Sequence, residues 1–434
     1  MKRSLFSQAL HTLATILIGQ GAMIAAGIAI SRAYGPVGKG VVSYAGIAIM
    51  AAMAIGDGLS AAVARVAGDD PSRVPAAYAA ARRIVAIVSL IAAPPIALLG
   101  AFVPSQHALI AVAIAFPFAL YLQTMNGFHL IRLRVERTNV ASLATNAATG
   151  VAMLVAIATH RVDLNGILTI WVLGYAAGAL IVSRGLHQLA REALRADVGR
   201  TLRELTQFAR LSSLSSLATY LSVRVDVFIV SALLSPVALG NYTLALACGE
   251  LMWQVSRAIS YSAYGRVAIA SFEDGAAITA RITRLVIALE LISAVVAFVL
   301  GPTLVTLVYG SAFAGAGIAL RFLLPGMMVY AADAILTYFL SVRANRPGLI
   351  VRIELVTLSI CALTTFATVG RYGIIGPAIA TTLAYLFSFG AKAIVFARST
   401  GISARDLLVV KGEDFAALRG APRAIDSGAT AAQL

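Results

Sequence analysis

About twelve apolar stretches, each roughly 20 to 27 residues long, follow one another along this chain. A stretch of about 20 apolar residues crosses a lipid bilayer as an α-helix. The stretches lack the strict alternation of apolar and polar residues that marks a membrane β-barrel. We therefore expect an all-α polytopic membrane protein, with spans at 10–33, 40–66, 84–103, 108–132, 139–160, 164–186, 210–235, 239–264, 282–308, 316–342, 349–370 and 375–397.

The composition agrees with a chain that lies mostly in lipid. Apolar residues make up 60% of the sequence and charged residues only 12%, which is about half the charged fraction of a soluble domain. The net charge of +15 would favour nucleic-acid binding if it were gathered in one basic region. The Lys and Arg residues lie instead in short clusters between the apolar stretches. We expect the bilayer, and no nucleic acid, as a partner.

The distribution of Lys and Arg between the stretches predicts an orientation. If both termini are cytoplasmic, nearly all the Lys and Arg residues of the loops fall on the cytoplasmic side, in line with the positive-inside rule. The outer side then holds Arg32, Lys39, Arg161 and Arg371. The first stretch is too long for a typical signal peptide, so we expect an uncleaved first helix.

Motifs of enzymes and of metal sites are missing from the sequence. The two cysteines, Cys248 and Cys361, both lie inside apolar stretches, which argues against a disulfide framework or a zinc site. There is no P-loop, HExxH or GxSxG motif, and the loops are too short for a soluble catalytic domain. We expect no catalytic residue, no metal and no cofactor.

A basic amphipathic segment divides the stretches into two sets of six. Residues 187–209 place leucines and valine at helical spacing with arginines largely elsewhere, which is typical of a helix at the cytoplasmic interface. The expected domains are an N-terminal six-helix lobe at 1–186, this linker at 187–209, a C-terminal six-helix lobe at 210–398 and a cytoplasmic tail at 399–434.

The two halves repeat one pattern at an offset of about 200 residues. Pro36 and Gly40 lie between the first and second spans of the first half, and they recur as Pro236 and Gly240 in the second. Since each half has an even number of spans, both halves have the same orientation. We expect a parallel repeat, related by an axis along the membrane normal.

Polar residues inside the spans are the candidates for function, because each charge there costs about 2.5–3.5 kcal/mol. The expected eighth span carries a polar stripe, flanked by Trp253, that consists of Glu250, Gln254, Arg257, Ser260, Tyr261 and Tyr264. These residues are spaced 4, 3, 3, 1 and 3 apart, which places the stripe on one helix face. It is either the wall of a polar cavity or a hydrogen-bonded seam between helices.

Arg224 and Asp226 in the expected seventh span point to different sides of the helix, because they are two residues apart. Each of them either lines a cavity or holds the helix to a neighbour. Asp57 is the repeat counterpart of Arg257, and a salt bridge between them would close the cytoplasmic end of a central cleft. The alternative is that each pairs within its own lobe.

Asp333 lies near the middle of the expected tenth span. It could bind a coupling proton or sodium ion, or it could pair with Arg321 or a backbone amide. Glu290 is a similar but weaker candidate. Lys392 and Arg321 lie towards span ends, where long cationic side chains commonly reach out to the interface.

Three segments resemble the bacterial polysaccharide transporters, the oligosaccharide-flippase branch of the superfamily that also holds the multidrug and toxic compound extrusion (MATE) exporters. They are SRAYGPVGKGVVSYAGIAIMAAMAIGDGL (31–59), YLSVRVDVFIVSALLSPVALGNYTLALACGELMW (220–253) and LVYGSAFAGAGIALRFLLPGMM (307–328). The second segment contains an Arg-x-Asp, a Gly-x-Tyr and then an acid. The resemblance covers nearly the whole chain in order.

This resemblance implies two six-helix lobes that form a V and rock between inward-open and outward-open states. It implies a protein of the bacterial inner membrane whose cargo is an undecaprenyl-pyrophosphate-linked oligosaccharide for O-antigen, capsule or exopolysaccharide synthesis, next to polysaccharide polymerase machinery. Cationic cleft residues of the family meet the anionic cargo, a role that Arg257 matches best and Arg224 next. Trp253, Tyr261 and Tyr264 would stack on sugar rings. The chain has fewer expected spans than flippases of peptidoglycan precursors, so lipid II is the less expected cargo.

Two other classes compete with this interpretation. A MATE-like antiporter of drugs and cations would need acidic ion sites, for which Asp57, Asp226, Glu250 and Asp333 are candidates. A membrane polymerase or glycosyltransferase would need a catalytic domain outside the membrane, for which the loops leave no room.

Overall fold

The computed structural model describes residues 5–409 except 69, 104, 105, 133, 134, 161 and 195. It is almost entirely helical, and no strand occurs among those residues. The first half contains α1 (Leu5–Ala67), η1 (Pro71–Arg73), α2 (Val74–Phe102), α3 (Ala108–Ile131), α4 (Val135–Ser142), the π-helix η3 (Leu143–Ala148), α5 (Thr149–Ala158), α6 (Leu164–Arg184) and α7 (His187–Ala193).

The second half begins with α8 (Gly199–Leu233) and α9 (Pro236–Ile269). It continues with α10 (Phe272–Tyr309), η4 (Ser311–Phe313), α11 (Ala314–Tyr338), the π-helix η5 (Phe339–Arg343), α12 (Pro347–Tyr372), α13 (Ile375–Thr400) and η6 (Ala404–Leu407). Each of the expected spans coincides with these helical segments, with ends that run at most two residues past a helix.

Ten helical segments of the described chain are long and apolar enough to cross a bilayer. The first of them, Ala14–Ala67, contains two expected spans, because Gly35 (φ 64°) interrupts α1 just before Pro36. The eighth expected span lies in α9, which is not among these ten segments. The all-α polytopic architecture expected from the sequence is therefore confirmed, and the chain is a multi-pass membrane protein.

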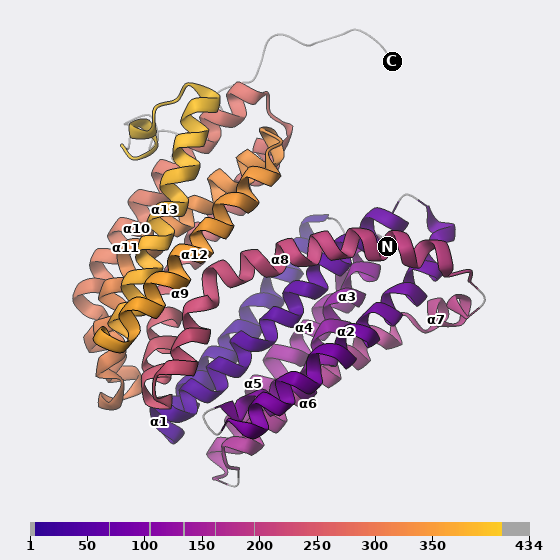
Figure 1. Cartoon of the computed structure of the whole chain (residues 1–434), viewed down its shortest axis with the longest axis horizontal. Coiled ribbons are helices and arrows are strands. Elements are labelled where there is room, and N and C mark those ends of the chain that lie inside the picture. The colour runs from indigo at the N-terminus through magenta and orange to yellow at the C-terminus, as the bar shows by residue number, and fades with distance from the viewer. Residues whose placement is uncertain are drawn as a thin grey trace.

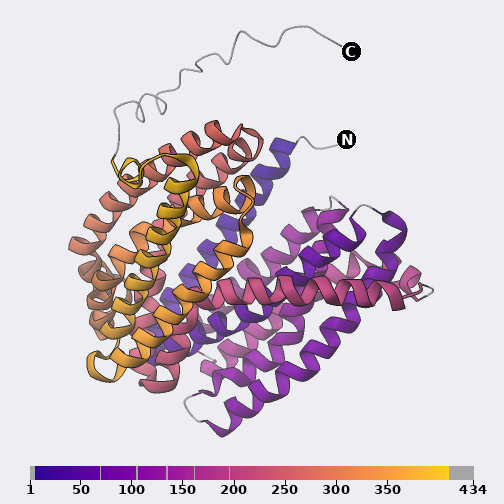
Figure 2. The same cartoon turned by 45° about the horizontal axis from the view of Figure 1, so that its top comes forward.

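The helices form two packed groups that diverge like the arms of a V (Figures 1 and 2). In the first group, α3 packs against α1, α2 and α6. In the second, α11 packs against α9, α10 and α13, and α12 against α13. We call α1–α6 the N-terminal lobe and α9–α13 the C-terminal lobe.

Helix α8 connects the two lobes (Figure 1). Its first half lies on the N-terminal lobe, where Ser212 and Ser213 donate to the carbonyl oxygens of Gly58 (2.7 Å) and Ile55 (2.8 Å) in α1. Its second half packs on α12. The segment 199–209, which we expected to belong to a separate interfacial helix, is the first part of α8. The reason is that Leu205 and Ala209 are buried, so this segment packs on protein.

The repeat seen in the sequence brings equivalent residues together where the lobes meet. A Cβ atom built on Gly240 would lie 1.8 Å from the carbonyl oxygen of Pro36, and one on Gly40 would lie 2.8 Å from that of Pro236. Only glycine allows two backbones to approach this closely. The predicted topology places this contact at the outer end of the molecule.

Candidate functional site

An ion pair between α8 and α9 lies where the two lobes join. Nη1 of Arg224 is 2.5 Å from Oε1 of Glu250, and their side chains keep 17% and 28% of their surface exposed. Lys39 of α1 is within electrostatic range of the same carboxylate. Three helices thus contribute two cations and one anion to a partly accessible cluster, which we call the junction cluster: Lys39, Arg224 and Glu250.

Local contacts explain how α8 holds Arg224 at this junction. One turn earlier, the hydroxyl of Tyr220 donates to the backbone oxygen of Ile47 in α1, and the ring of Phe228 packs edge-on against Tyr44, with centroids 6.0 Å apart. These contacts lie on either side of Arg224 along α8. They fasten the middle of the helix to α1 and direct the guanidinium towards α9.

Asp226 lies on another side of α8 and has no exposed surface. Its carboxylate accepts hydrogen bonds from the Tyr242 hydroxyl, from Oγ1 of Thr381 (2.7 Å) and from the backbone N–H of Val227 (2.8 Å). Among the described side chains, no Lys or Arg forms an ion pair with it. The sequence-based inference that Arg224 and Asp226 face different partners is therefore correct.

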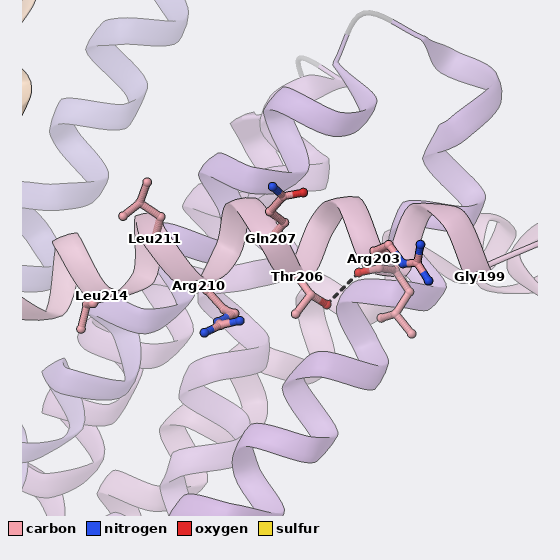
Figure 3. Close-up of a pocket in the computed structure, with 8 residues that line it drawn as sticks. Gly199, Arg203, Thr206, Gln207, Arg210, Leu211 and Leu214 are labelled. Atoms are coloured by element: carbon pink, nitrogen blue, oxygen red, sulfur yellow. Dashed lines mark hydrogen bonds between the residues drawn. The ribbon is translucent and has the colours of Figure 1, made fainter.

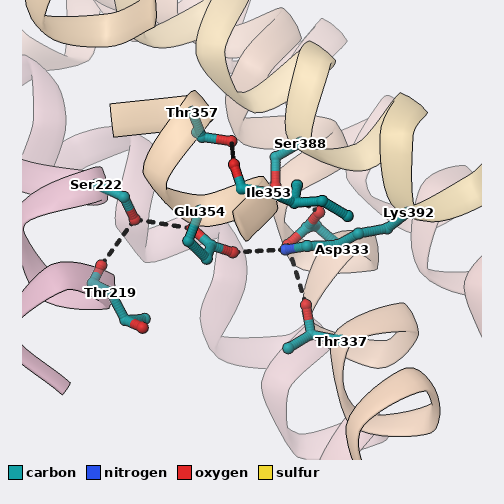
Figure 4. A network of polar contacts seen from close by, with 9 residues as sticks. All are labelled: Thr219, Ser222, Asp333, Thr337, Ile353, Glu354, Thr357, Ser388 and Lys392. Carbon is teal, nitrogen blue, oxygen red and sulfur yellow. Dashed lines mark hydrogen bonds and ion pairs between the residues drawn. The ribbon is translucent and has the colours of Figure 1, made fainter. Parts of the chain in front are cut away.

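A second buried charge network joins α11, α12 and α13 (Figure 4). Nζ of Lys392 lies 2.5 Å from Oδ2 of Asp333 and 2.6 Å from Oε1 of Glu354. Ser388 donates to Asp333 (3.0 Å), and Ser222 of α8 donates to the other oxygen of Glu354 (2.8 Å). We call Asp333, Glu354 and Lys392 the carboxylate–lysine triad.

The triad corrects two expectations. Lys392 does not reach out to the interface: it is completely buried, because two carboxylates from neighbouring helices offset the cost of burying its charge. Asp333 does not pair with Arg321, whose Nε donates to the backbone oxygen of Phe298. Sequence reasoning also missed Glu354, although an acid inside the expected span 349–370 was a signal of the same kind as Asp333.

Two roles were expected for the polar stripe of α9, the wall of a polar cavity or a hydrogen-bonded seam between helices. Different parts of the stripe match each of them. Glu250 and Gln254 keep exposed surface. Ser260 is buried and donates to the backbone oxygen of Ser256, and Ser256 in turn donates to Glu290 of α10. The first part of the stripe is thus accessible, and the later part contains a seam inside the C-terminal lobe. The side chains of Arg257 and Tyr261 lie outside the described part of the structure.

The aromatic residues near the stripe are occupied by protein contacts. Trp253 is 5% exposed, donates from Nε1 to the backbone oxygen of Met327 (3.0 Å) and packs on Tyr330 with ring centroids 4.5 Å apart. Tyr264 stacks on Tyr338 at 4.1 Å. In this conformation Trp253 is buried and one face of the Tyr264 ring is covered, so the structure does not present the pair as an open surface for sugar stacking.

Asp57 is exposed and accepts a hydrogen bond from Nε2 of Gln123 in α3. Both residues belong to the N-terminal lobe, which matches the alternative that Asp57 pairs within its own lobe. Since the Arg257 side chain is not described, the salt bridge between Asp57 and Arg257 stays a prediction.

Comparisons with known proteins agree on the architecture. No family model and no curated protein matches the sequence. Among solved structures, an inward-facing multidrug resistance MATE family transporter of the MOP superfamily aligns with a TM-score of 0.66 and 16% identity, covering 91% of this chain and 99% of its own. The inward-closed lipid II flippase MurJ aligns with a TM-score of 0.66 and 12% identity, covering 93% and 89%.

This chain has the fold of the MATE-like transporters. A further match, with a TM-score of 0.57 and 15% identity over 90% of this chain and 95% of the other, is a MOP superfamily transporter from Pyrococcus furiosus described as having a binding pocket of reverse polarity. At identities this low the likeness establishes the fold, and the activity has to be argued from the residues of the site.

Proposed function

We propose that this protein flips an undecaprenyl-pyrophosphate-linked oligosaccharide across the bacterial inner membrane by alternating access. The observation that carries the proposal is the composition of the junction cluster. Arg224 pairs with Glu250 in a partly accessible site, and Lys39 brings a second cation within electrostatic range of the same carboxylate. A diphosphate that leaves water needs charge-assisted donors, and arginine offers two in a planar fork.

The ion pair also explains how the cluster is stable without cargo. A lone guanidinium away from bulk water is costly, so Glu250 holds the charge of Arg224 in the empty state. A diphosphate would compete with Glu250 for the guanidinium and release the carboxylate. Gln254, exposed one turn further along α9, could then donate to a sugar hydroxyl. Arg257, one turn further again, remains a proposed cargo contact.

The contact between Pro36 and Gly240 supplies the outer gate of alternating access in this proposal. It closes the end that the predicted topology places outside. The guanidinium of Arg32 strengthens the closure by donating from Nε to the backbone oxygen of Val308 (2.8 Å) and from Nη2 to that of Leu307 (2.5 Å) in α10. Opening to the outside would break these bonds while the lobes turn as units.

Asp226 is the residue we propose for coupling to a proton or sodium ion. Its carboxylate is buried, and it is bonded to two hydroxyl groups and an amide instead of a cation. The triad is a poorer candidate for an ion site, because the ammonium of Lys392 already occupies the space between its two carboxylates.

A MATE-like antiporter of cationic compounds is the second candidate, and Asp226 is the observation that favours it. Such a protein would need a cargo site with an excess of negative charge. The accessible guanidinium of Arg224 in the junction cluster suits an anionic cargo better than a cationic one, which places this function second.

Deletion of the gene from its host tests the choice between the two functions. A flippase predicts that lipid-linked glycan accumulates on the inner leaflet while surface glycan falls, with resistance to cationic drugs unchanged. Normal surface glycan together with lower drug resistance would contradict the flippase proposal and support the antiporter.

A further inference from the structure

An open hollow of about 740 Å³ lies along one side of the cytoplasmic half of α8, and all its lining residues, from Gly199 to Leu214, belong to this helix (Figure 3). Its polar lining includes Arg203 and Arg210, which are seven residues apart and therefore share a helix face about 10 Å apart along the axis. Both side chains are exposed. The hollow is separate from the junction cluster, whose residues do not line it.

The two arginines lack counter-charges. The acid nearest in sequence, Glu204, pairs with Arg73 and with Arg200 (3.0 Å to Nε), away from the hollow. No Asp or Glu lines the hollow, and in the described structure neither Arg203 nor Arg210 has an ion-pair partner. Two exposed guanidinium groups on one face of α8 offer charge-assisted donors to an anion with more than one charge.

The lining changes from cationic to apolar along the helix. Arg203, Gln207 and Arg210 come first, and Leu211 and Leu214 follow, 75% and 65% exposed. In the predicted topology this direction runs from the cytoplasm towards the middle of the membrane. A molecule with a charged head and an apolar tail would meet the arginines with its head and the leucines with its tail.

We propose that this hollow is a loading site for the diphosphate head of a polyprenyl-linked glycan, from which the cargo passes to the junction cluster. Charge favours this occupant over a monoanionic membrane phospholipid. A diphosphate substituted at both ends carries two negative charges and neutralises both arginines, whereas a phosphatidylglycerol carries one and leaves an arginine unpaired. This inference rests on the proposed flippase function.

Binding of farnesyl diphosphate, whose free terminal phosphate gives it about one negative charge more than the doubly substituted cargo, to the full-length protein in nanodiscs of neutral lipid tests the site. R203Q and R210Q should each weaken binding about tenfold, and the double variant about a hundredfold, because each removes a charge-assisted contact. R200Q is the matched control: the same change on the same helix, at a residue that pairs with Glu204 and does not line the hollow. It should change binding less than about twofold.

Three results would overturn the loading site. The double variant could bind farnesyl diphosphate as tightly as the wild type, R200Q could weaken binding as much as R203Q, or phosphatidylglycerol added to the nanodiscs could displace the probe. Failure of the flippase function itself gives a different pattern: farnesyl diphosphate binds in an arginine-dependent way, but reconstituted protein moves no lipid-linked glycan.

Discussion

Gly240 of α9 meets Pro36 of α1 so closely that a Cβ atom on the glycine would lie 1.8 Å from the proline carbonyl oxygen. The repeat counterparts of these two residues, Gly40 and Pro236, make the reciprocal contact, and together the contacts join the lobes at one end. Any side chain at position 240 must push the backbones apart.

We therefore predict that Gly240→Ala opens the outer end of the protein. In a C361A background, the partly exposed Cys248, two helical turns along α9, should react faster with a membrane-impermeant maleimide added from outside. Gly46→Ala is the control, because nothing lies within 4 Å of a Cβ at that position. Equal labelling of the two variants would show that the contact does not close the protein.

The carboxylate–lysine triad should be essential for stability. Lys392→Met leaves Asp333 and Glu354 buried together without their cation, so we expect a loss of about 3–5 kcal/mol, the usual cost of breaking a buried pair. Thermal unfolding in detergent measures the loss. Adding D333N and E354Q to K392M should restore much of the stability, since the neutral amides no longer repel. A triple variant as unstable as K392M would refute this explanation.

Arg224 should matter for transport more than for folding. In the double variant R224Q/E250Q no charge of the pair is left alone, so the protein should fold with a melting temperature near that of the wild type. Transport should still fall at least about tenfold, because the guanidinium that meets the diphosphate is gone. Arg371→Gln, a change at an exposed arginine, should leave transport intact. Wild-type transport by the double variant would remove Arg224 from the cargo path.

Asp226→Asn should abolish the coupling of transport to a proton or sodium gradient. The amide fills the same space and can still accept from Tyr242 and Thr381, but it can neither release a proton nor attract sodium. We expect the rate of the variant to be independent of an imposed proton or sodium gradient. Asp163→Asn, at the exposed N-terminus of α6, is the control. If the variant responds to gradients as the wild type does, the coupling site lies elsewhere.

The fold could be predicted from the sequence because membrane spans are defined by local composition. Pro36 and Gly40 recur as Pro236 and Gly240, and this repeat predicted which residues of the two halves are equivalent. The structure brings the two segments into contact. The helix faces of Arg224 and Asp226 followed from their spacing alone.

The partners of the buried charges could not be predicted in the same way. Lys392 was placed at the interface because it lies towards a span end, and only the packing of α11, α12 and α13 brings Asp333 and Glu354 to its ammonium. Trp253 lies beside a polar stripe in the sequence, yet its ring faces Tyr330. The continuity of 199–209 with α8 depends on burial of Leu205 and Ala209, which is a tertiary effect.

Flipping of a fluorescent undecaprenyl-pyrophosphate oligosaccharide in proteoliposomes tests the central claim most directly. The account predicts that wild-type protein moves the labelled lipid between leaflets, that R224Q/E250Q does not, and that cationic drugs neither are transported nor compete. Transport of a cationic drug with no movement of the lipid-linked glycan would contradict it.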